Sequence, residues 1–414
     1  MTQHNEPKAV EPRRPSASLN RREFLAAAGA TAAAFTLVRP RAVRGSQASA
    51  KIALGLIGCG GRGTWIADLF KNHGGYEWVA AADYFEDRVN VFGEKFGIDA
   101  ARRYTGLSGY RKLIDSKLDA VVIESPPYFH PEQAAAGIAG GRHVYLAKPI
   151  AVDVPGCTTI AEAGRQATAK KLVFLADFQT RADATYREAV KRVHNGDIGR
   201  IVSAEAVYYC GVTWGDATLD PADAEARLRA WGVDRALSGD VITEQNIHAL
   251  DVATWILDAA PLRAVGSCGR KARGGSGNCN DHFAVVYGFP NDVLLSFASK
   301  QYGQGYDDIG CRVFGPRGTI DTHYFGTVNI RGETPYAGGK MDNLYTDGVV
   351  ANIKEFHDCI TTGRHENLTV APSVRSNLTT LLGRMAAYTG RAVTWDEMMK
   401  ANEKLAADLK GLKA

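Results

Sequence analysis

The sequence predicts an α/β protein in two parts: a doubly wound parallel sheet (a Rossmann-type domain), followed by an α+β domain with a large, mainly antiparallel sheet. Three observations lead to this prediction. A glycine-rich turn joins an apolar run to a helical pattern within residues 52–70. Short apolar runs then alternate with helical patterns to about residue 178, which is typical of repeated βα units. Beyond residue 179 longer alternating runs are separated by Gly and Asn-Asp turns, as in antiparallel sheets.

The first 50 residues are expected to lie outside this fold. Asn20–Leu25 is a twin-arginine pattern, and an alanine-rich apolar stretch follows it from Leu25 to Val38. This stretch is shorter than the roughly 20 apolar residues of a membrane span, so it predicts a signal peptide ending near Ala48-Ser49-Ala50. We therefore expect the twin-arginine export machinery as a partner and a periplasmic or otherwise exported location. An uncleaved basic tail and a lipid-facing anchor are the alternatives.

The charge of the chain depends on this N-terminal segment. The whole chain has 49 Lys and Arg residues and 45 Asp and Glu residues. Residues 1–50 contain eight of the basic residues and three of the acidic ones. Residues 51–414 therefore have 41 basic and 42 acidic residues, a formal charge of −1. Nothing in that balance predicts binding to nucleic acid or to an anionic membrane. The seven cysteines are scattered and include no CxxC pair, so neither a zinc site nor a disulfide framework is predicted.

The glycine turn has the order that dinucleotide binding requires. An apolar strand over Ile52–Ile57 precedes it, and a helix over Thr64–Phe70 follows it. In such turns the first glycine allows the tight bend, the second lets the backbone approach a pyrophosphate, and the third allows close packing at the positive end of the helix. The candidate cofactor-binding residues of the turn are Gly58, Gly60, Gly61, Arg62 and Gly63.

A second strand, over Trp78–Ala82, ends in Asp83, 20 residues after Gly63. A carboxylate at this position accepts hydrogen bonds from the adenosine ribose, and it repels the additional 2′-phosphate of NADP. The sequence therefore predicts NAD as the cofactor.

The remaining elements follow in order. Up to residue 178 we expect strands over Val121–Ile123, Val144–Leu146 and Leu172–Leu175, and helices over Pro131–Ala139 and Val154–Ala169. The first two of these strands are expected to stop at Ser125-Pro126-Pro127 and at Lys148-Pro149. A residue followed by proline is typical of an extended turn. From residue 179 onward we expect helices over Ala182–His194, Ser238–Leu257, Val350–Thr362, Val374–Tyr388 and Thr394–Leu409, with strands over Ile201–Tyr209, Ala264–Gly269, Phe283–Tyr287, Val293–Ser299 and Arg312–Phe314. The chain is thus divided into residues 1–50, 51–178 and 179–414.

Three residues are candidates for acid–base chemistry. Lys148 follows a strand, which places its ammonium at the ligand-binding edge of a doubly wound sheet. Glu244 and His248 are four residues apart, so one continuous helix would bring them to the same face, with Asp251 nearby. A histidine beside a carboxylate suits proton transfer near neutral pH. The alternatives are that Lys148 is an ordinary surface lysine and that Glu244 and His248 form an ion pair on a helix surface. Glu244 and His248 could also be half of a metal site. No third ligand has an identifiable spacing, so no metal is predicted.

Together these residues resemble the glucose–fructose oxidoreductase, inositol dehydrogenase and rhizopine-catabolism (Gfo/Idh/MocA) family over essentially all of residues 51–414. The glycine turn and Asp83 match its NAD site. Ser125-Pro126-Pro127 with His130 resembles its (T/S)PPxxH turn near the nicotinamide, and Gln179 with Arg181 resembles its Gln-x-Arg turn into the second domain. Ala147-Lys148-Pro149 is similar to its Glu-Lys-Pro motif, whose lysine is catalytic, and Glu244 and His248 fall on its sugar-contacting Asp-x-x-x-His. The resemblance implies a homodimer or homotetramer, joined through the open face of the second sheet.

Two departures from the family pattern leave the reaction open. Ala147 replaces the motif glutamate, and Glu244 replaces the aspartate. The first hypothesis is an NAD-dependent oxidoreductase that acts on a sugar, polyol or glycoside, with Lys148 polarising the hydroxyl and His248 moving its proton. The alternative is an NAD-dependent glycosidase or keto-sugar hydratase or lyase, which oxidises the sugar transiently without net redox change. A third is a non-enzymatic sugar-binding protein. Aromatic and polar loops over Trp214–Asp223, Tyr302–Asp308 and Tyr324–Gly339 suit a carbohydrate ligand.

Overall fold

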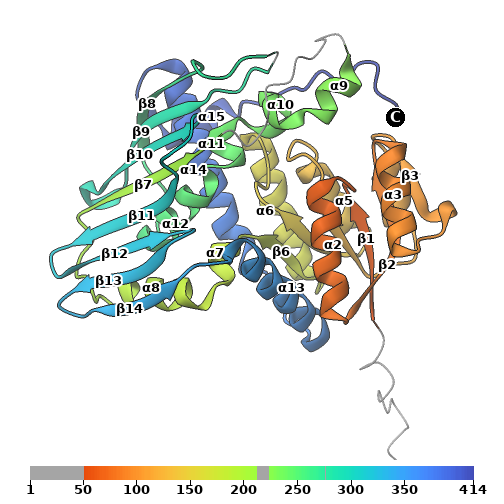
Figure 1. Ribbon diagram of the computed structural model, residues 1–414, viewed down its shortest axis with the longest axis horizontal. Coiled ribbons are helices and arrows are strands. Elements are labelled where there is room, and N and C mark those ends of the chain that lie inside the picture. Colours follow the sequence, from red (N-terminus) through yellow and green to blue (C-terminus); the bar gives the residue numbers. More distant parts are fainter. Residues whose placement is uncertain (1–50, 212–222, 276) are drawn as a thin grey trace, which may run out of the picture. The chain divides into compact units, whose positions relative to one another are not determined.

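A computed structural model describes residues 51–211, 223–275 and 277–414 (Figure 1). The predicted signal peptide and most of the predicted loop Trp214–Asp223 lie outside the described residues. Residues 51–414 form one compact unit that contains two sheets. Of the helices that the structure describes, none has the length and apolar character needed to cross a membrane.

The first sheet has six parallel strands in the order β3-β2-β1-β4-β5-β6. Its strands are β1 (Ile52–Ile57), β2 (Tyr76–Asp83), β3 (Arg103–Thr105), β4 (Ala120–Ile123), β5 (His143–Ala147) and β6 (Phe174–Asp177). The helices between them are α2 (Gly61–His73), α3 (Glu86–Phe96), α4 (Gly109–Asp115), α5 (His130–Ala139) and α6 (Val154–Ala169). The strand order reverses between β1 and β4, and ligands of open α/β sheets bind at such a point, outside the carboxyl ends of the strands. The doubly wound prediction is confirmed.

The second sheet has nine strands in the order β14-β13-β12-β11-β7-β10-β9-β8-β15. They are β7 (Ser203–Cys210), β8 (Arg263–Gly269), β9 (His282–Gly288), β10 (Leu294–Gln301), β11 (Asp308–Gly315), β12 (Gly318–His323), β13 (Thr327–Gly332), β14 (Tyr336–Lys340) and β15 (Val393–Thr394). Only β7 and β10 pair in parallel; the other neighbouring strands are antiparallel. The predicted loop Tyr324–Gly339 is wrong in part, because β13 and most of β14 fall within it.

Helices from the second half of the chain cover both sheets. They are α7 (Gln179–Ala182), α8 (Ala184–His194), α9 (Ala224–Arg229), α10 (Arg235–Ser238), α11 (Val241–Glu244), α12 (Ile247–Leu257), α13 (Leu344–Thr362), α14 (Val370–Thr389) and α15 (Trp395–Ala401). α13 packs beside α2 on the first sheet, where Tyr76 donates a hydrogen bond to the backbone oxygen of Ile353 (2.8 Å). α12 packs against the second sheet with nine of its eleven residues buried.

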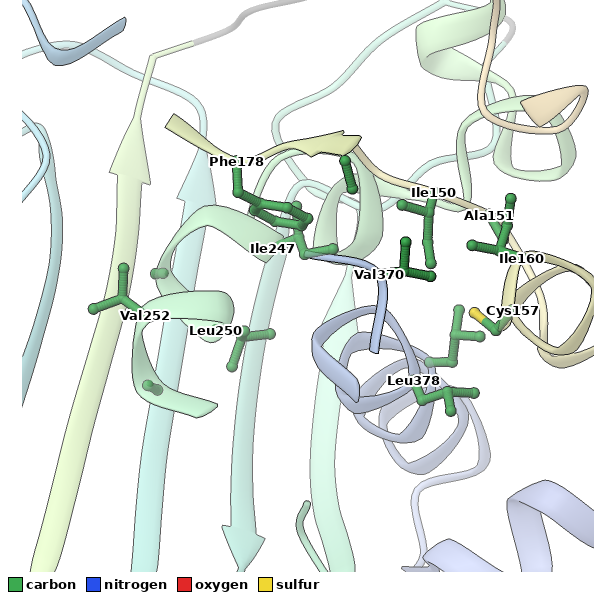
Figure 2. Packing of buried hydrophobic residues seen from close by; sticks show 14 of the residues in the cluster. Ile150, Ala151, Cys157, Ile160, Phe178, Ile247, Leu250, Val252, Val370 and Leu378 are labelled. Atoms are coloured by element: carbon green, nitrogen blue, oxygen red, sulfur yellow. The ribbon is translucent and has the colours of Figure 1, made fainter. Parts of the chain in front are cut away.

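One hydrophobic core continues across the two sheets (Figure 2). Ile150 and Cys157 come from the first half of the chain, and Ile247, Val370 and Leu378 come from α12 and α14 in the second half. α14 lies between α6 and the second sheet, and it contacts both. This shared core fixes the position of the second half relative to the carboxyl ends of the first sheet.

Two predicted helices are shorter than the sequence pattern indicates. The helix expected over 238–257 is broken at Gln245 and Asn246, so α11 and α12 are separate. The helix expected over 394–409 begins as predicted, with a capping box between Thr394 and Glu397, but it ends at Ala401, since Asn402 has a left-handed backbone (φ 44°). Residues beyond Asn402 run on without helix or strand across α9.

Candidate functional site

The glycine turn is built by close backbone approaches. Gly58 has a φ of +98°, and a Cβ there would lie 2.5 Å from the backbone nitrogen of Ser125. A Cβ on Gly63 would lie 1.9 Å from the backbone oxygen of Gly58. Around Gly61, in contrast, no atom lies within 4 Å of a Cβ position. The turn is therefore closed towards the sheet and open at the first residue of α2, where a phosphate would meet the helix N-terminus.

A cavity of about 290 Å³ lies against this turn. It gathers eight of the predicted cofactor-binding residues, which are Gly58, Gly60, Gly61, Arg62, Gly63, Asp83, Ser125 and Pro126. It is also lined by residues that the sequence did not single out, among them Phe85, Arg88, Glu124, Leu228, Arg229 and Trp231. Phe85 and Arg88 lie just beyond Asp83 at the end of β2, so sequence proximity could have found them; the residues from 228 to 231 come from the second half of the chain.

Asp83 holds the glycine turn in place as well as lining the cavity. Its Oδ2 accepts a hydrogen bond from the backbone nitrogen of Cys59 (2.7 Å), and its Oδ1 accepts one from the backbone nitrogen of Phe85 (2.9 Å). Burial raises the pKa of this carboxyl above its ordinary value, against the effect of these two hydrogen bonds and of Arg88.

Arg62 is bound to acidic residues at the ends of two strands. Its guanidinium lies 3.0 Å from Glu124, which follows β4, and 2.9 Å from Asp177, the last residue of β6. It also donates a hydrogen bond to the hydroxyl of Tyr345 on α13 (2.7 Å). Burial raises the pKa of Glu124 to about 7, although the charge of Arg62 opposes that shift. Glu124 and Asp177 were not predicted as site residues, even though both stand at strand ends, as Lys148 does.

Lys148 and Glu244 form a buried pair beside this network. The Lys148 Nζ donates to the backbone oxygen of Glu244 at 2.7 Å and lies 3.2 Å from Glu244 Oε1. The two side chains are 11% and 10% exposed, so solvent screens their attraction little. Lys148 directly follows β5, as predicted, and it is close enough to Glu124 to lower the pKa of that carboxyl.

The predicted arrangement of Glu244 and His248 is wrong. Because α11 ends at Glu244 and α12 begins at Ile247, the two residues do not share one helix face, and the Glu244 carboxylate pairs with Lys148 instead. A carboxylate paired with His248 would raise the pKa of its imidazole, and the opposite shift is found. Burial lowers the pKa of His248 well below 6.5, and the charges of Lys148 and Arg62 lower it further. The imidazole is therefore neutral at physiological pH.

Asp251 lies three residues after His248 on α12, as predicted, but its carboxylate is bound by other residues. It is fully buried and binds the guanidinium of Arg181 through both carboxylate oxygens, at 2.9 to 3.0 Å, and it accepts a hydrogen bond from Ser376 (2.6 Å). The ion pair joins α7 to α12, and the hydrogen bond from Ser376 joins α12 to α14.

His130 and Gln179 lie outside the lining of the cavity. The two ring nitrogens of His130 lie 2.8 Å from the backbone oxygen of Pro149 and 2.7 Å from that of Ser125. Burial lowers its pKa to about 4, so the ring is neutral and its single N–H donates to one of these two oxygens. Gln179 is fully buried at the start of α7, and neither of its amide atoms has a hydrogen-bond partner in the described part of the chain.

Several buried polar atoms of Glu244, Asn246, His248 and Gln179 lack hydrogen-bond partners among residues 51–211, 223–275 and 277–414. They are Oε2 of Glu244, Nδ1 of His248 and both side-chain amide atoms of Asn246 and of Gln179. Buried polar groups in proteins nearly always have partners, so the free atoms of Glu244 and His248, which keep 8% exposure each, are candidates for contact with a ligand, whereas Asn246 and Gln179 are fully buried. The sequence did not single out Asn246. No group of three or more His, Cys, Asp or Glu that could hold a metal ion occurs within the described ranges.

The residues present fit a bound dinucleotide. The turn is open at the first residue of α2, Asp83 lies at the end of β2, and the cavity lies at the point where the strand order reverses. A Rossmann domain of this form, with a buried lysine–carboxylate pair and a neutral histidine beyond the cavity, defines a nicotinamide-dependent oxidoreductase.

Comparison with known proteins gives the family. The protein-family model described as "Oxidoreductase family, NAD-binding Rossmann fold" matches residues 52–175. A second family model, described as "GFO/IDH/MocA C-terminal domain", matches residues 186–321. Together they span more than half of the sequence. The chain belongs to the Gfo/Idh/MocA family of oxidoreductases, and its cofactor is NAD.

Individual relatives agree with this assignment. An inositol 2-dehydrogenase of Burkholderia cenocepacia (strain HI2424) is 28% identical over 271 residues, which are 64% of this chain and 72% of that protein. A 1,5-anhydro-D-fructose reductase of Ensifer adhaerens is 25% identical over 79% of this chain and 93% of its own. The structure of levoglucosan dehydrogenase with NADH has a TM-score of 0.68 at 18% identity, covering 83% of this chain and 99% of that one. The aldose-aldose oxidoreductase of Caulobacter crescentus, complexed with glycerol, has a TM-score of 0.66 at 19% identity, with the same coverage.

Proposed function

We propose that the protein transfers a hydride between NAD and a carbinol carbon of a sugar, polyol or glycoside. The observation that carries this proposal is the buried Lys148–Glu244 pair, whose lysine lies close enough to His248 to lower the pKa of its imidazole. Relatives named as inositol and levoglucosan dehydrogenases and as an anhydrofructose reductase support this substrate class.

Each residue has one part in this reaction. NAD, when bound, supplies the redox chemistry. The neutral imidazole of His248 takes the proton of the substrate hydroxyl on a ring nitrogen, because its low pKa leaves that nitrogen unprotonated. The ammonium of Lys148 stabilises the negative charge that develops on the same oxygen, and Glu244 fixes the position of that ammonium.

The test is a survey of cyclitols, aldoses and anhydrosugars with the NAD-loaded protein, followed by absorbance of the reduced nicotinamide. We expect turnover with at least one of these compounds, its loss in Lys148→Ala, and its retention in Lys117→Ala, which changes an exposed lysine. Absence of turnover with every polyhydroxylated compound in both directions would contradict the proposal.

A second candidate is glycoside cleavage or keto-sugar hydration through transient oxidation. It is favoured by the carboxylate at Lys148, which comes from Glu244 on α11, whereas position 147 carries alanine. This reaction predicts release of the aglycone from aryl glycosides with no lasting change in nicotinamide absorbance. Net reduction of NAD by the free sugar, without aglycone release, would favour the simple dehydrogenase.

We also propose that residues 1–50 are a twin-arginine signal, that residues 51–178 bind NAD and that residues 179–414 bind the substrate and form the oligomer. The Arg21-Arg22 pair supports export to the periplasm. Exposed Val265, Val286 and Leu294 on β8, β9 and β10 support a homodimer or homotetramer formed by the second sheet. Replacement of both arginines by lysine should keep the protein in the cytoplasm, and Val286→Asp should lower the mass measured by light scattering.

A further inference from the structure

The part of the cavity next to Asp83 has walls from both halves of the chain. Phe85 and Arg88 come from the first half, and Leu228, Arg229 and Trp231 come from α9 and the turn after it in the second half. Asp83 marks the adenosine end of the NAD site. Residues of the second half of the chain therefore close the end of the site that lies farthest from the reacting groups.

α9 is attached to the Rossmann domain by polar and stacking contacts. The guanidinium of Arg229 binds both carboxylate oxygens of Asp87, at 2.9 and 3.3 Å, and its Cζ lies 3.8 Å from the centre of the Phe85 ring. Tyr84 donates a hydrogen bond to Glu225 at 2.8 Å. A paired guanidinium stacked on a ring is a geometrically specific contact, because its planar fork is fixed in two directions.

The C-terminal segment 402–414 lies across α9 and is bound on both sides of it (Figure 1). Before α9, the backbone nitrogen of Leu405 donates to Asp153 (3.0 Å). At α9, Arg227 donates to the backbone oxygen of Asp408 (3.0 Å). Beyond α9, the backbone of Lys413 accepts from the nitrogen of Leu107 (3.1 Å) and donates to the hydroxyl of Tyr84 (3.1 Å).

Apolar contacts accompany these hydrogen bonds. Ala407 and Leu412 of the segment pack on a small cluster formed by Phe85, Leu228 and Leu237. Phe85 and Leu228 of this cluster also line the cavity, so the segment lies directly behind two of its walls. α9 cannot move away from Phe85 without disturbing this cluster and the hydrogen bonds of the segment.

We propose that α9 and residues 402–414 form a strap that keeps NAD bound between turnovers. The strap lengthens the residence time of the cofactor, since dissociation at the adenosine end requires α9 and the segment to separate from Tyr84, Phe85 and Leu107. Differences in affinity between related complexes lie mainly in the dissociation rate, so this rate is the quantity to measure. The proposal rests on NAD as the cofactor and is independent of the substrate.

The test compares NADH dissociation from five forms of the protein, four of which are full-length. They are the wild type, a form that ends at Ala401, Arg229→Ala, Arg227→Ala and Lys404→Ala. Each form is loaded with NADH, an excess of NAD is added, and the loss of bound NADH fluorescence is followed without sugar. We expect at least about tenfold faster dissociation from the shortened form and from Arg229→Ala. Arg227→Ala should give a smaller increase, because it removes the hydrogen bond to Asp408 of the segment but leaves the cavity lining intact. Lys404→Ala changes an exposed residue of the same segment and should match the wild type.

Equal dissociation rates for the wild type, the shortened form and Arg227→Ala would overturn the proposal. If the shortened form does not fold, as judged by its circular dichroism, Arg227→Ala and Arg229→Ala decide the matter alone. A wild type that exchanges NADH faster than it turns over would overturn it as well. Failure of every sugar substrate would contradict the proposed function, yet it would leave these rates unchanged.

Discussion

The ammonium of Lys148 lies 2.7 Å from the backbone oxygen of Glu244 and 3.2 Å from its Oε1, so one residue holds the lysine by its backbone and by its charge. The contact joins the end of β5 in the first sheet to the end of α11 in the second half of the chain. Glu244 is therefore a partner of Lys148, and the geometry assigns it no contact with His248.

Lys148→Ala should lower kcat about 100-fold or more, because it removes the charge that stabilises the substrate oxygen. NAD affinity should change little, since Lys148 does not line the cavity at the glycine turn. Steady-state kinetics and NADH titration measure the two effects separately. A variant that keeps more than about a tenth of the wild-type kcat would show that Lys148 has no catalytic part.

Glu244→Gln should lower kcat about tenfold while Lys148 keeps its bond to the backbone oxygen of residue 244. Glu244→Asp should lower kcat too, because its carboxylate is one methylene further from Nζ. Neither change should move the acidic limb of the kcat/KM profile, since Glu244 is not among the groups that shift the pKa of His248. An acidic limb displaced to lower pH in Glu244→Gln would restore the Glu244–His248 pair that the sequence suggested.

His248 should remain neutral, and so able to accept a proton, at a lower pH than a free histidine. Burial and the cations Lys148 and Arg62 disfavour the imidazolium, which places its pKa well below 6.5. The acidic limb of kcat/KM that depends on His248 should therefore lie below pH 6.5. NMR of the labelled imidazole checks the value, and Lys148→Met should raise it by removing one cation. His248→Asn should remove this limb together with most of the rate.

Glu124 should make the stability of the NAD-free protein depend on pH. Its pKa is raised in the folded state from 4.5 to about 7, so its contribution is greatest at low pH and is lost as the pH rises towards and through 7. Between pH 5.5 and 8.5 this loss is roughly 2 kcal/mol for one such group. The free energy of unfolding of Glu124→Gln should therefore fall less than that of the wild type over this range. Parallel pH profiles in urea titrations would contradict the raised pKa.

Asp83→Ser should remove most of the preference for NAD over NADP, because it deletes the charge that repels a 2′-phosphate. Calorimetric titration should show at least about a tenfold preference for NAD in the wild type, and a much smaller one in the variant. The change should also cost about 1–3 kcal/mol of stability, since the backbone nitrogens of Cys59 and Phe85 lose their acceptor. Equal binding of NAD and NADP by the wild type would contradict this function of Asp83.

The sequence predicted the elements around the cofactor closely, because their signals are local. The helix over Val154–Ala169 has the predicted bounds, and the glycine turn has its strand and helix on either side. The cavity brings together eight of the predicted residues for the same reason: strand ends and turns meet at one edge of a parallel sheet.

The pairing expected for the candidate acid–base residues differs from the one in the structure. A helical period places Glu244 and His248 on one face only if the helix is continuous, and the break at Gln245 and Asn246 has no glycine or proline to mark it. The partners of Arg62 depend on which strands are neighbours, and the spacing of residues carries no such information. The extended segment after Ala401 has an amphipathic period as well, but its apolar residues pack on the cluster around Phe85 instead.

The core shared by the two sheets bears on how this protein can diversify. Ile150 and Cys157 from the first half pack in one cluster with Val370 and Leu378 from the second (Figure 2). Exchange of one half for that of a distant relative would place mismatched apolar surfaces against each other, and such mismatches cost several kcal/mol when cavities form. The two halves therefore depend on each other for stability, and neither can be exchanged alone without repacking this core.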